Sequence, residues 1–208
     1  MRNLTRRILA LSLFAFCSIA TGFGGTILFL GDSLTAGLGV QQEQAYPALI
    51  EKKIREKNLP FEVINAGVSG DTTAGGLARL DWVLQKKVDV LVLALGANDG
   101  LRGLPVAQMK ANLQAIIDRV KLKNPTVKII IAGMRMPPNL GDDYAAAFQQ
   151  VFPELARANN ATLIPFLLEG VGGHIDLNQP DHIHPTAAGH KVVAENVWRT
   201  LEPLLEKD

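Results

Sequence analysis

The chain has 208 residues, a formal net charge of +1 at pH 7 and a hydrophobic fraction of 48%. This length is typical of one domain, and the balanced composition excludes a disordered or low-complexity protein. Because nucleic-acid-binding domains carry a basic patch, the near-neutral charge also indicates a protein without a nucleic-acid partner.

Residues 1–20 have the pattern of an export signal. A positively charged start, MRNLTRR, precedes the apolar stretch ILALSLFAFC, which is too short to span a bilayer comfortably. The small residues Ser18 and Ala20 then occupy the two positions that a signal peptidase reads. We expect cleavage after Ala20 and a mature domain of residues 21–208, present as a periplasmic or secreted monomer without a membrane span. An uncleaved anchor helix is the alternative.

Beyond residue 20, apolar runs alternate with helix-sized segments. Two of the runs, 88–96 and 127–133, are nearly continuous Val, Leu and Ile, as in strands buried on both faces. The predicted strands cover 26–30, 61–66, 88–96, 127–133 and 161–166, and the predicted helices about 44–58, 74–86, 106–123, 142–159 and 185–203. One helix per strand predicts an α/β/α sandwich with a parallel sheet and helices on both faces. We expect Pro153 to kink or split the fourth helix.

Small and polar residues follow the predicted strands, at the edge where an open parallel sheet binds its ligands. The motif GDS (31–33) follows the first strand, NAGVSGDTT (65–73) the second and GAND (96–99) the third, and DHIHP (181–185) precedes the last helix. This arrangement predicts one functional site at the carboxyl ends of the strands.

Three residues of these motifs can form a nucleophilic triad. The Ser33 hydroxyl needs a base within hydrogen-bond reach, and that base needs a partner that orients it. Asp181 and His184 are three residues apart and can meet on one side of a turn. Pro185 suits the first position of a helix, so we expect His184 at the cap of the last helix.

Three groups are candidate donors to an oxyanion: the N–H of Ser33, the N–H of Gly67 and the side-chain amide of Asn98. A glycine at position 67 lets a backbone N–H approach a ligand closely. Each piece alone also fits a structural role, because Ser33 can cap a helix and Asn98 can form a turn. The four motifs together, each next to a strand end, favour catalysis.

Other chemistries have weaker support in the sequence. The HIH motif, with Asp176 and Asp181 nearby, could bind a metal, but two histidines at i and i+2 are a weak zinc signal without a Cys or HExxH motif. The GxGxxG and GxSxG motifs of dinucleotide-binding folds and of ordinary α/β-hydrolases are absent from the sequence. We therefore expect no metal and no cofactor. We interpret His174, His182 and His190 as solvent-facing or structural residues.

The four motifs resemble those of the SGNH-hydrolase superfamily, the GDSL esterases and lipases. GDSLTAG is similar to the first block of that superfamily, NAGVSGDTT to the second, GAND to the third and DHIHP to the fifth. The resemblance implies a flavodoxin-like fold with five central parallel strands. It also implies that Ser33, Asp181 and His184 are the triad, and that Ser33, Gly67 and Asn98 form the oxyanion hole.

Within the superfamily the chain is similar to the bacterial periplasmic thioesterase/lysophospholipase/arylesterase subgroup. The similarity lies in the stretches INAGVSGDTTAGGLARL, LGANDGLRGLP and MRMPPNLGDDY. It implies a serine hydrolase that cleaves carboxylic esters and thioesters, including lipid acyl esters, through an acyl-enzyme. Two alternatives stay open: a carbohydrate O-acetylesterase with the same catalytic set, and a non-catalytic exported binding domain.

Two segments, 134–144 and 166–180, are long enough to wall an acyl pocket. Their apolar residues could equally belong to the core. The candidate substrate-binding residues are Asp32, Met134, Met136, Leu140, Phe166 and Leu167.

Overall fold

The computed structural model describes residues 24–136 and 140–206, which form one central parallel sheet. Its strands are β1 (Gly25–Gly31), β2 (Phe61–Gly67), β3 (Val90–Ala94), β4 (Lys128–Ala132) and β5 (Thr162–Ile164). They lie in the order β2-β1-β3-β4-β5, and every neighbouring pair is parallel. This order is that of flavodoxin-like folds, and the predicted five-stranded α/β architecture is confirmed.

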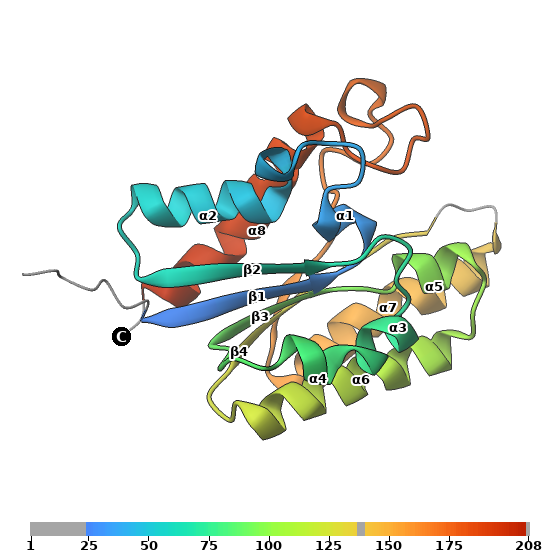
Figure 1. Ribbon diagram of the computed structural model, residues 1–208. Helices are drawn as coiled ribbons and strands as arrows, with labels where there is room; N and C mark the ends of the chain where they lie inside the picture. The colour runs from blue at the N-terminus through green and yellow to red at the C-terminus, as the bar shows by residue number, and fades with distance from the viewer. Residues whose placement is uncertain (1–23, 137–139, 207–208) are drawn as a thin grey trace, which may run out of the picture.

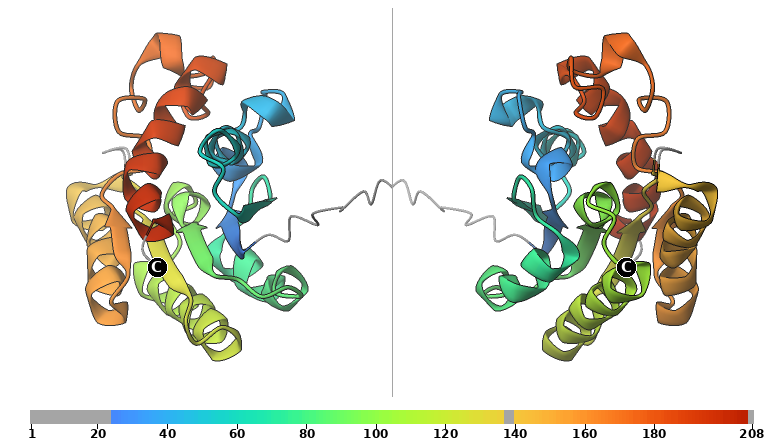
Figure 2. Two further views of the ribbon diagram at one scale, coloured as in Figure 1. Left: turned by 90° about the vertical axis from the view of Figure 1, so that its left-hand side faces the viewer. Right: turned by 90° about the vertical axis from the view of Figure 1, so that its right-hand side faces the viewer.

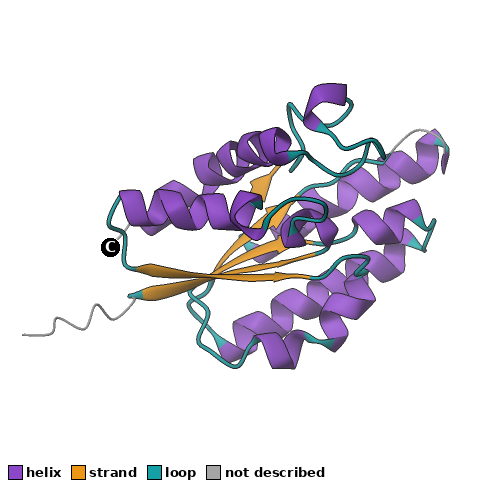
Figure 3. Cartoon of the chain, turned by 45° about the horizontal axis from the view of Figure 1, so that its top comes forward, coloured by secondary structure: helices purple, strands orange, loops and turns teal. Residues whose placement is uncertain are grey.

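Helices cover both faces of the sheet (Figures 1 and 3). Helices α2 (Tyr46–Glu56) and α8 (Ala187–Leu205) pack on one face. Helices α3 (Thr73–Ala78), α4 (Leu80–Val83), α6 (Val106–Lys123) and α7 (Asp142–Asn159) lie on the other face. The views in Figure 2 show the same layers along the strands. Two short helices, α1 (Ser33–Ala36) and α5 (Ala97–Leu101), follow the carboxyl ends of β1 and β3.

The central strands hold the layers together through their apolar side chains. Residues 27–30 of β1 are completely buried, and no residue of β3 is more than 1% exposed. Full burial of an aliphatic side chain stabilises the fold by about 1.5–3 kcal/mol. The edge strand β2 is only half-buried. Such a core keeps the strand ends in place, which allows the loops after them to position a site.

The register brings three strand ends to the same level. Gly31 at the end of β1 lies opposite Gly67 of β2 on one side and Ala94 of β3 on the other. The motifs that follow these strands therefore begin side by side at one edge of the sheet.

Two predicted helices differ from the structure. The predicted helix 74–86 is broken at Arg79, where α3 ends and α4 begins. Of the two predicted effects of Pro153, a kink or a split, the split is wrong, because α7 continues through it as one element. Pro153 has no N–H to donate to the carbonyl of Gln149, and Gln149 is exposed. Water can satisfy that carbonyl, which lowers the cost of the proline.

The predicted signal segment, residues 1–20, lies outside the described residues. Among the residues that are described, no helix is both long and apolar enough to cross a membrane.

Candidate active site

The first strand ends directly in the candidate nucleophile. Asp32 caps α1, and its Oδ1 atom accepts a hydrogen bond of 3.0 Å from the N–H of Leu34. Ser33 is the first residue of this helix and is 8% exposed. The turn requires glycine at position 31, because a Cβ atom there would lie 2.0 Å from Oγ1 of Thr35. The sharp connection places the Ser33 hydroxyl at the edge of the sheet.

Ser33, His184 and Asp181 form a continuous hydrogen-bonded chain. The Ser33 Oγ atom lies 2.8 Å from His184 Nε2, and His184 Nδ1 lies 2.6 Å from Asp181 Oδ2. With the imidazole proton on Nδ1, His184 donates to the carboxylate and its Nε2 accepts from the serine hydroxyl. This is the arrangement in which a histidine can remove a serine proton.

The Asp181 carboxylate is held in its charged form by the loop around it. Its Oδ1 atom accepts hydrogen bonds from the N–H groups of His184 (3.0 Å) and Ile183 (2.9 Å). These bonds and the contact with the His184 ring lower the pKa of Asp181 to about 2. Asp181 is therefore ionised at neutral pH and favours the imidazole with a proton on Nδ1.

The loop that carries Asp181 and His184 is built differently from the prediction. Helix α8 begins at Ala187, and its cap is Thr186, which accepts a hydrogen bond from the N–H of Gly189. The prediction that His184 caps this helix, with Pro185 as its first residue, is wrong. Pro185 instead forms an antiparallel bridge with Asn178, directly before the Thr186 cap.

Two of the predicted oxyanion donors lie at the catalytic edge of the sheet. The N–H of Ser33 starts α1, and none of the described residues accepts a hydrogen bond from it. The Asn98 side chain lies in the first turn of α5, and its Nδ2 atom donates to the carbonyl of Asp71 at 3.0 Å. Its contact with Asp32 Oδ2 is longer, 3.5 Å, so the second amide hydrogen is only loosely held.

The structure argues against the third predicted donor, Gly67. Its N–H already donates to Asn65 Oδ1 at 2.9 Å. A Cβ atom at position 67 would lie 2.2 Å from the backbone nitrogen of Ala36, so this glycine allows α1 to pack closely against β2. The sequence predicts that the glycine at position 67 lets a ligand approach its N–H. In the structure, the missing side chain of Gly67 instead makes room for α1.

Gly70 is a candidate donor that sequence reasoning missed. It is exposed, has a left-handed φ of +81°, and none of the described residues accepts a hydrogen bond from its N–H. Its neighbour Asp71 is the residue that holds the Asn98 amide. The second glycine of NAGVSGDTT could have indicated this residue, because a glycine in a loop often marks a left-handed φ that exposes a backbone N–H.

Asp32 is not a substrate-binding residue in this structure, which corrects the prediction. Its side chain is fully buried below the site, where it caps α1. Burial raises the pKa of Asp32 to about 6, against the lowering effect of the Leu34 N–H. Its contacts with Leu34 and Asn98 support the catalytic loops from below.

The other histidines lie in different surroundings. His190 is 1% exposed, stacks on Tyr46 and accepts a hydrogen bond from the Tyr46 N–H, so it is structural as expected. Burial lowers its pKa to about 4. His174 is exposed, and His182 lines the pocket beside the triad. Among the described residues, no group of three or more His, Cys, Asp or Glu side chains could hold a metal ion.

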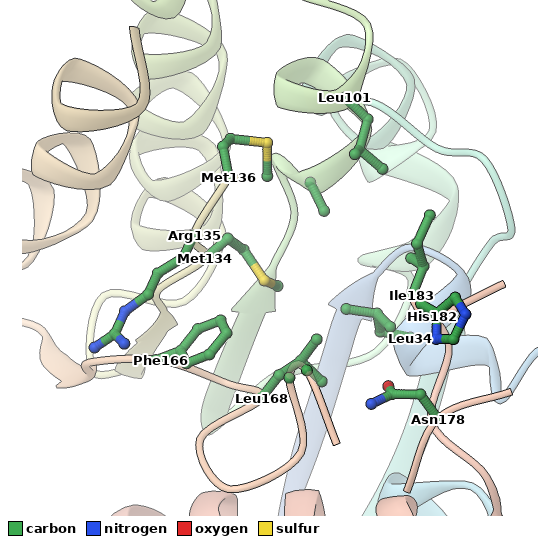
Figure 4. A pocket seen from close by; sticks show the side chains of 13 residues that line it. Leu34, Leu101, Met134, Arg135, Met136, Phe166, Leu168, Asn178, His182 and Ile183 are labelled. Atoms are coloured by element: carbon green, nitrogen blue, oxygen red, sulfur yellow. The ribbon is translucent and has the colours of Figure 1, made fainter. Parts of the chain in front are cut away.

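An apolar pocket of about 250 Å³ adjoins the triad (Figure 4). Leu34 and Ile183, the chain neighbours of Ser33 and His184, lie on one side of it together with His182. The facing side is formed by the predicted residues Met134, Met136 and Phe166, and by Leu168.

Two predicted pocket residues are not part of this lining. Leu167 is completely buried in the core, and Leu168 lines the pocket in its place. Leu140 is 36% exposed and lies outside the lining. Leu167 and Leu168 lie in a turn after β5, which directs Leu167 into the core and Leu168 toward the pocket.

Comparison with known proteins identifies relatives of this architecture. The chain is 42% identical over 181 residues to "Esterase TesA" of Pseudomonas aeruginosa, covering 86% of this chain and 89% of that protein. It is 38% identical to "Thioesterase 1/protease 1/lysophospholipase L1" of Escherichia coli (strain K12), covering 88% and 86%. The crystal structure of the psychrotrophic esterase EstA from Pseudoalteromonas sp., inhibited by monoethylphosphonate, matches with a TM-score of 0.82 and 33% identity, covering 88% of this chain and all of that one.

The model of the GDSL-like Lipase/Acylhydrolase family matches residues 29–192. This range contains all four motifs on which the resemblance was based. By this match and by the identity to its relatives, the chain belongs to the GDSL-like lipase/acylhydrolase family and is a hydrolase of acyl esters.

Proposed function

We propose that this protein hydrolyses carboxylic esters and thioesters through an acyl-enzyme formed on Ser33. The observation that carries the proposal is the hydrogen-bonded chain from Ser33 through His184 to an ionised Asp181. Ester and thioester carbonyls are electrophilic enough for direct attack by an activated serine, so the mechanism uses side chains and water alone.

In the first half of the reaction, the Ser33 oxygen forms a bond to the acyl carbon while its proton passes to His184 Nε2. The carbonyl oxygen becomes an oxyanion and accepts hydrogen bonds from the N–H of Ser33, the N–H of Gly70 and the Asn98 amide. The intermediate then collapses, the bond to the alcohol or thiol breaks, and His184 returns the proton to that leaving group. In the second half, a water molecule gives a proton to His184 and its oxygen bonds to the acyl carbon. The bond between this carbon and the Ser33 oxygen then breaks, His184 returns the proton to Ser33, and the acid leaves.

The pocket supports apolar acyl groups of short or medium length as substrates. It is lined mainly by aliphatic, aromatic and methionine side chains, and its volume of about 250 Å³ is slightly below the usual range of ligand sites. A carbohydrate O-acetylesterase needs only a small acyl site, so this apolar space favours a longer acyl chain over acetate. The name of the Escherichia coli relative supports thioesters and lysophospholipids as substrate classes.

We further propose that residues 1–20 direct export, and that residues 21–208 are a single catalytic domain that acts as a monomer in the periplasm or outside the cell. The charged start, the short apolar stretch and the small residues before position 21 support this. Mass spectrometry of the protein expressed with its own N-terminus in a Gram-negative host checks it, and the expected mature protein begins at Thr21.

The central experiment compares the wild type with Ser33→Ala. A fluorophosphonate probe should label the wild type at Ser33 and abolish its ester hydrolysis. The variant should keep the wild-type melting temperature, take up no label and lose activity by about 10⁴-fold or more. A well-folded Ser33→Ala protein that still hydrolyses esters contradicts the mechanism, and a wild type that neither reacts nor hydrolyses supports the non-catalytic alternative.

A further inference from the structure

Arg79 joins the first strand to the loop that carries the oxyanion donors. It lies between two helices, as the C-cap of α3 and the N-cap of α4. Its Nε atom donates to Asp71 Oδ2 at 2.7 Å, and its Nη2 atom donates to the carbonyl of Gly31 at 3.1 Å. Gly31 is two residues before Ser33. One guanidinium therefore contacts both the strand that leads to the nucleophile and the loop that contains Gly70 and Asp71.

This connection is shielded from solvent. The side chains of Arg79 and Asp71 are 19% and 12% exposed. Ion pairs on the surface contribute little because water and salt screen them, whereas a partly buried pair with good geometry holds its partners more firmly. The planar guanidinium also fixes two acceptors in a defined direction, which a lysine cannot do.

Asp71 transmits this restraint to Asn98. The side chain of Asp71 binds Arg79, and its backbone carbonyl accepts a hydrogen bond of 3.0 Å from Asn98 Nδ2. That bond uses one of the two amide hydrogens and so sets the direction of the other. Asp71 lies next to Gly70 in the chain, so the same residue borders the other proposed donor of this loop.

A glycine in α3 allows Asp71 to reach this position. A Cβ atom on Gly75 would lie 2.1 Å from Asp71 Oδ1. The absence of a side chain at position 75 therefore permits the carboxylate to approach the helix and meet Arg79. This contact is independent of the arginine and supports the same role for Asp71.

We propose that Arg79 is a positioning residue for the oxyanion hole: by holding Asp71 against the end of β1, it sets the direction of the Asn98 amide toward the acyl oxygen. The inference rests on the proposed oxyanion role of Asn98. Arg79 itself contacts neither the substrate nor the triad, so its effect appears in the chemical step and not in substrate binding.

The first test is Arg79→Gln, assayed on a p-nitrophenyl ester. We expect kcat to fall by about 10- to 100-fold, because small misplacements of catalytic groups have effects of this size, while KM stays within about threefold. Labelling by a fluorophosphonate should slow by a similar factor. Arg119→Gln is the matched control: Arg119 is 46% exposed, its ion-pair partner is Asp81 at 3.6 Å, and its loss should leave kcat unchanged.

A double-mutant cycle separates positioning from a general loss of stability. In an Asn98→Ala background, adding Arg79→Gln should lower kcat by less than about twofold, because the group that Arg79 positions is already gone. A full additional loss of 10-fold or more overturns the inference. So does an Arg79→Gln protein with wild-type kcat and labelling rate, whatever its melting temperature.

Gly75→Ala provides a second variant if Arg79→Gln fails to fold. It leaves Arg79 and Asp71 chemically unchanged but pushes the carboxylate away, so kcat should fall although alanine favours a helix. Wild-type kcat in Gly75→Ala contradicts the inference. If Asn98→Ala alone leaves kcat unchanged, the proposed oxyanion role fails, whereas a slow Asn98→Ala beside a fast, folded Arg79→Gln refutes only the role of Arg79.

Discussion

The Nε2 atom of His184 lies 2.8 Å from the Oγ atom of Ser33, although 151 positions separate the two residues in the chain. Ser33 follows the central strand β1, and His184 lies in the loop before α8. Their contact depends on the parallel sheet, which gathers the segments after its strands at one edge. The residues around this contact suggest experiments that distinguish catalytic groups from structural ones.

Removal of the Asn98 amide should affect the chemical step. We expect Asn98→Ala to lower kcat by about 10²–10³-fold, because an oxyanion donor is most important when charge develops on the acyl oxygen. KM should change only a few-fold, since the ground-state carbonyl is a weaker acceptor. Steady-state kinetics and the melting temperature of this variant check the prediction. A lower melting temperature with wild-type kcat indicates that Asn98 only shapes the turn.

Two glycines of the loop after β2 should respond differently to alanine. Gly67→Ala should destabilise the protein, because the new Cβ atom meets the backbone of Ala36 at 2.2 Å. Gly70→Ala has space, with its nearest neighbour 3.7 Å away, but its φ of +81° is strained for alanine. We therefore expect Gly70→Ala to fold. Its backbone should leave the strained φ and move the N–H of residue 70 away from the oxyanion, so kcat should fall strongly.

The measurements for this pair are the melting temperature and kcat of each purified variant. A stable Gly67→Ala enzyme with low kcat and a fully active Gly70→Ala enzyme return the donor role to Gly67. The opposite pattern supports the assignment of Gly70.

Enlarging the pocket at Phe166 should shift the preference for acyl chain length. Phe166 is one wall of the pocket, and the guanidinium of Arg135 covers its ring at 4.6 Å. We expect Phe166→Ala to raise the octanoyl-to-butyryl ratio of kcat/KM by several-fold, because each added methylene that finds apolar space contributes about 0.8 kcal/mol. Trp82→Ala is a suitable control, since Trp82 is 73% exposed and lies outside the pocket lining. An unchanged ratio indicates that the acyl chain binds elsewhere.

Two buried groups should make opposite contributions to the pH dependence of stability. Burial raises the folded-state pKa of Asp32 from 3.8 to about 6, so its contribution is full below pH 3.8 and is lost as the pH rises toward 6. Burial lowers the folded-state pKa of His190 from 6.5 to about 4, so its contribution is full above pH 6.5 and is lost as the pH falls toward 4. Each shift corresponds to about 3 kcal/mol, and the two offset each other in the wild type.

Single variants should reveal each contribution. In Asp32→Asn the melting temperature should fall as the pH drops from 6.5 to 4, because Asp32 no longer offsets the His190 effect. In His190→Asn the melting temperature should instead rise as the pH drops from 6 to 4, because the Asp32 contribution grows over this range. Thermal denaturation at a series of pH values measures both slopes. Parallel slopes in the two variants contradict the assignment of these pKa values.

Several features of this protein follow from the sequence alone. The runs 88–96 and 127–133 predicted buried central strands because apolar residues on both faces have no other stable location. Asp181 and His184 were expected to meet because a separation of three residues is a local relationship that a single turn satisfies. The position of three motifs directly after predicted strands also indicated that they share one edge of the sheet.

Only the tertiary structure distinguished residues of the same type within one motif. Gly67 and Gly70 belong to the same nine-residue stretch, but the N–H of Gly67 is used by Asn65 and its α-carbon packs on α1, whereas Gly70 is exposed with an unused N–H. Asp32 is next to the nucleophile in the chain and is nevertheless buried beneath it. Hydrogen-bond occupancy and burial depend on which segments pack together, and Arg79 contacts Gly31 across 48 positions for the same reason.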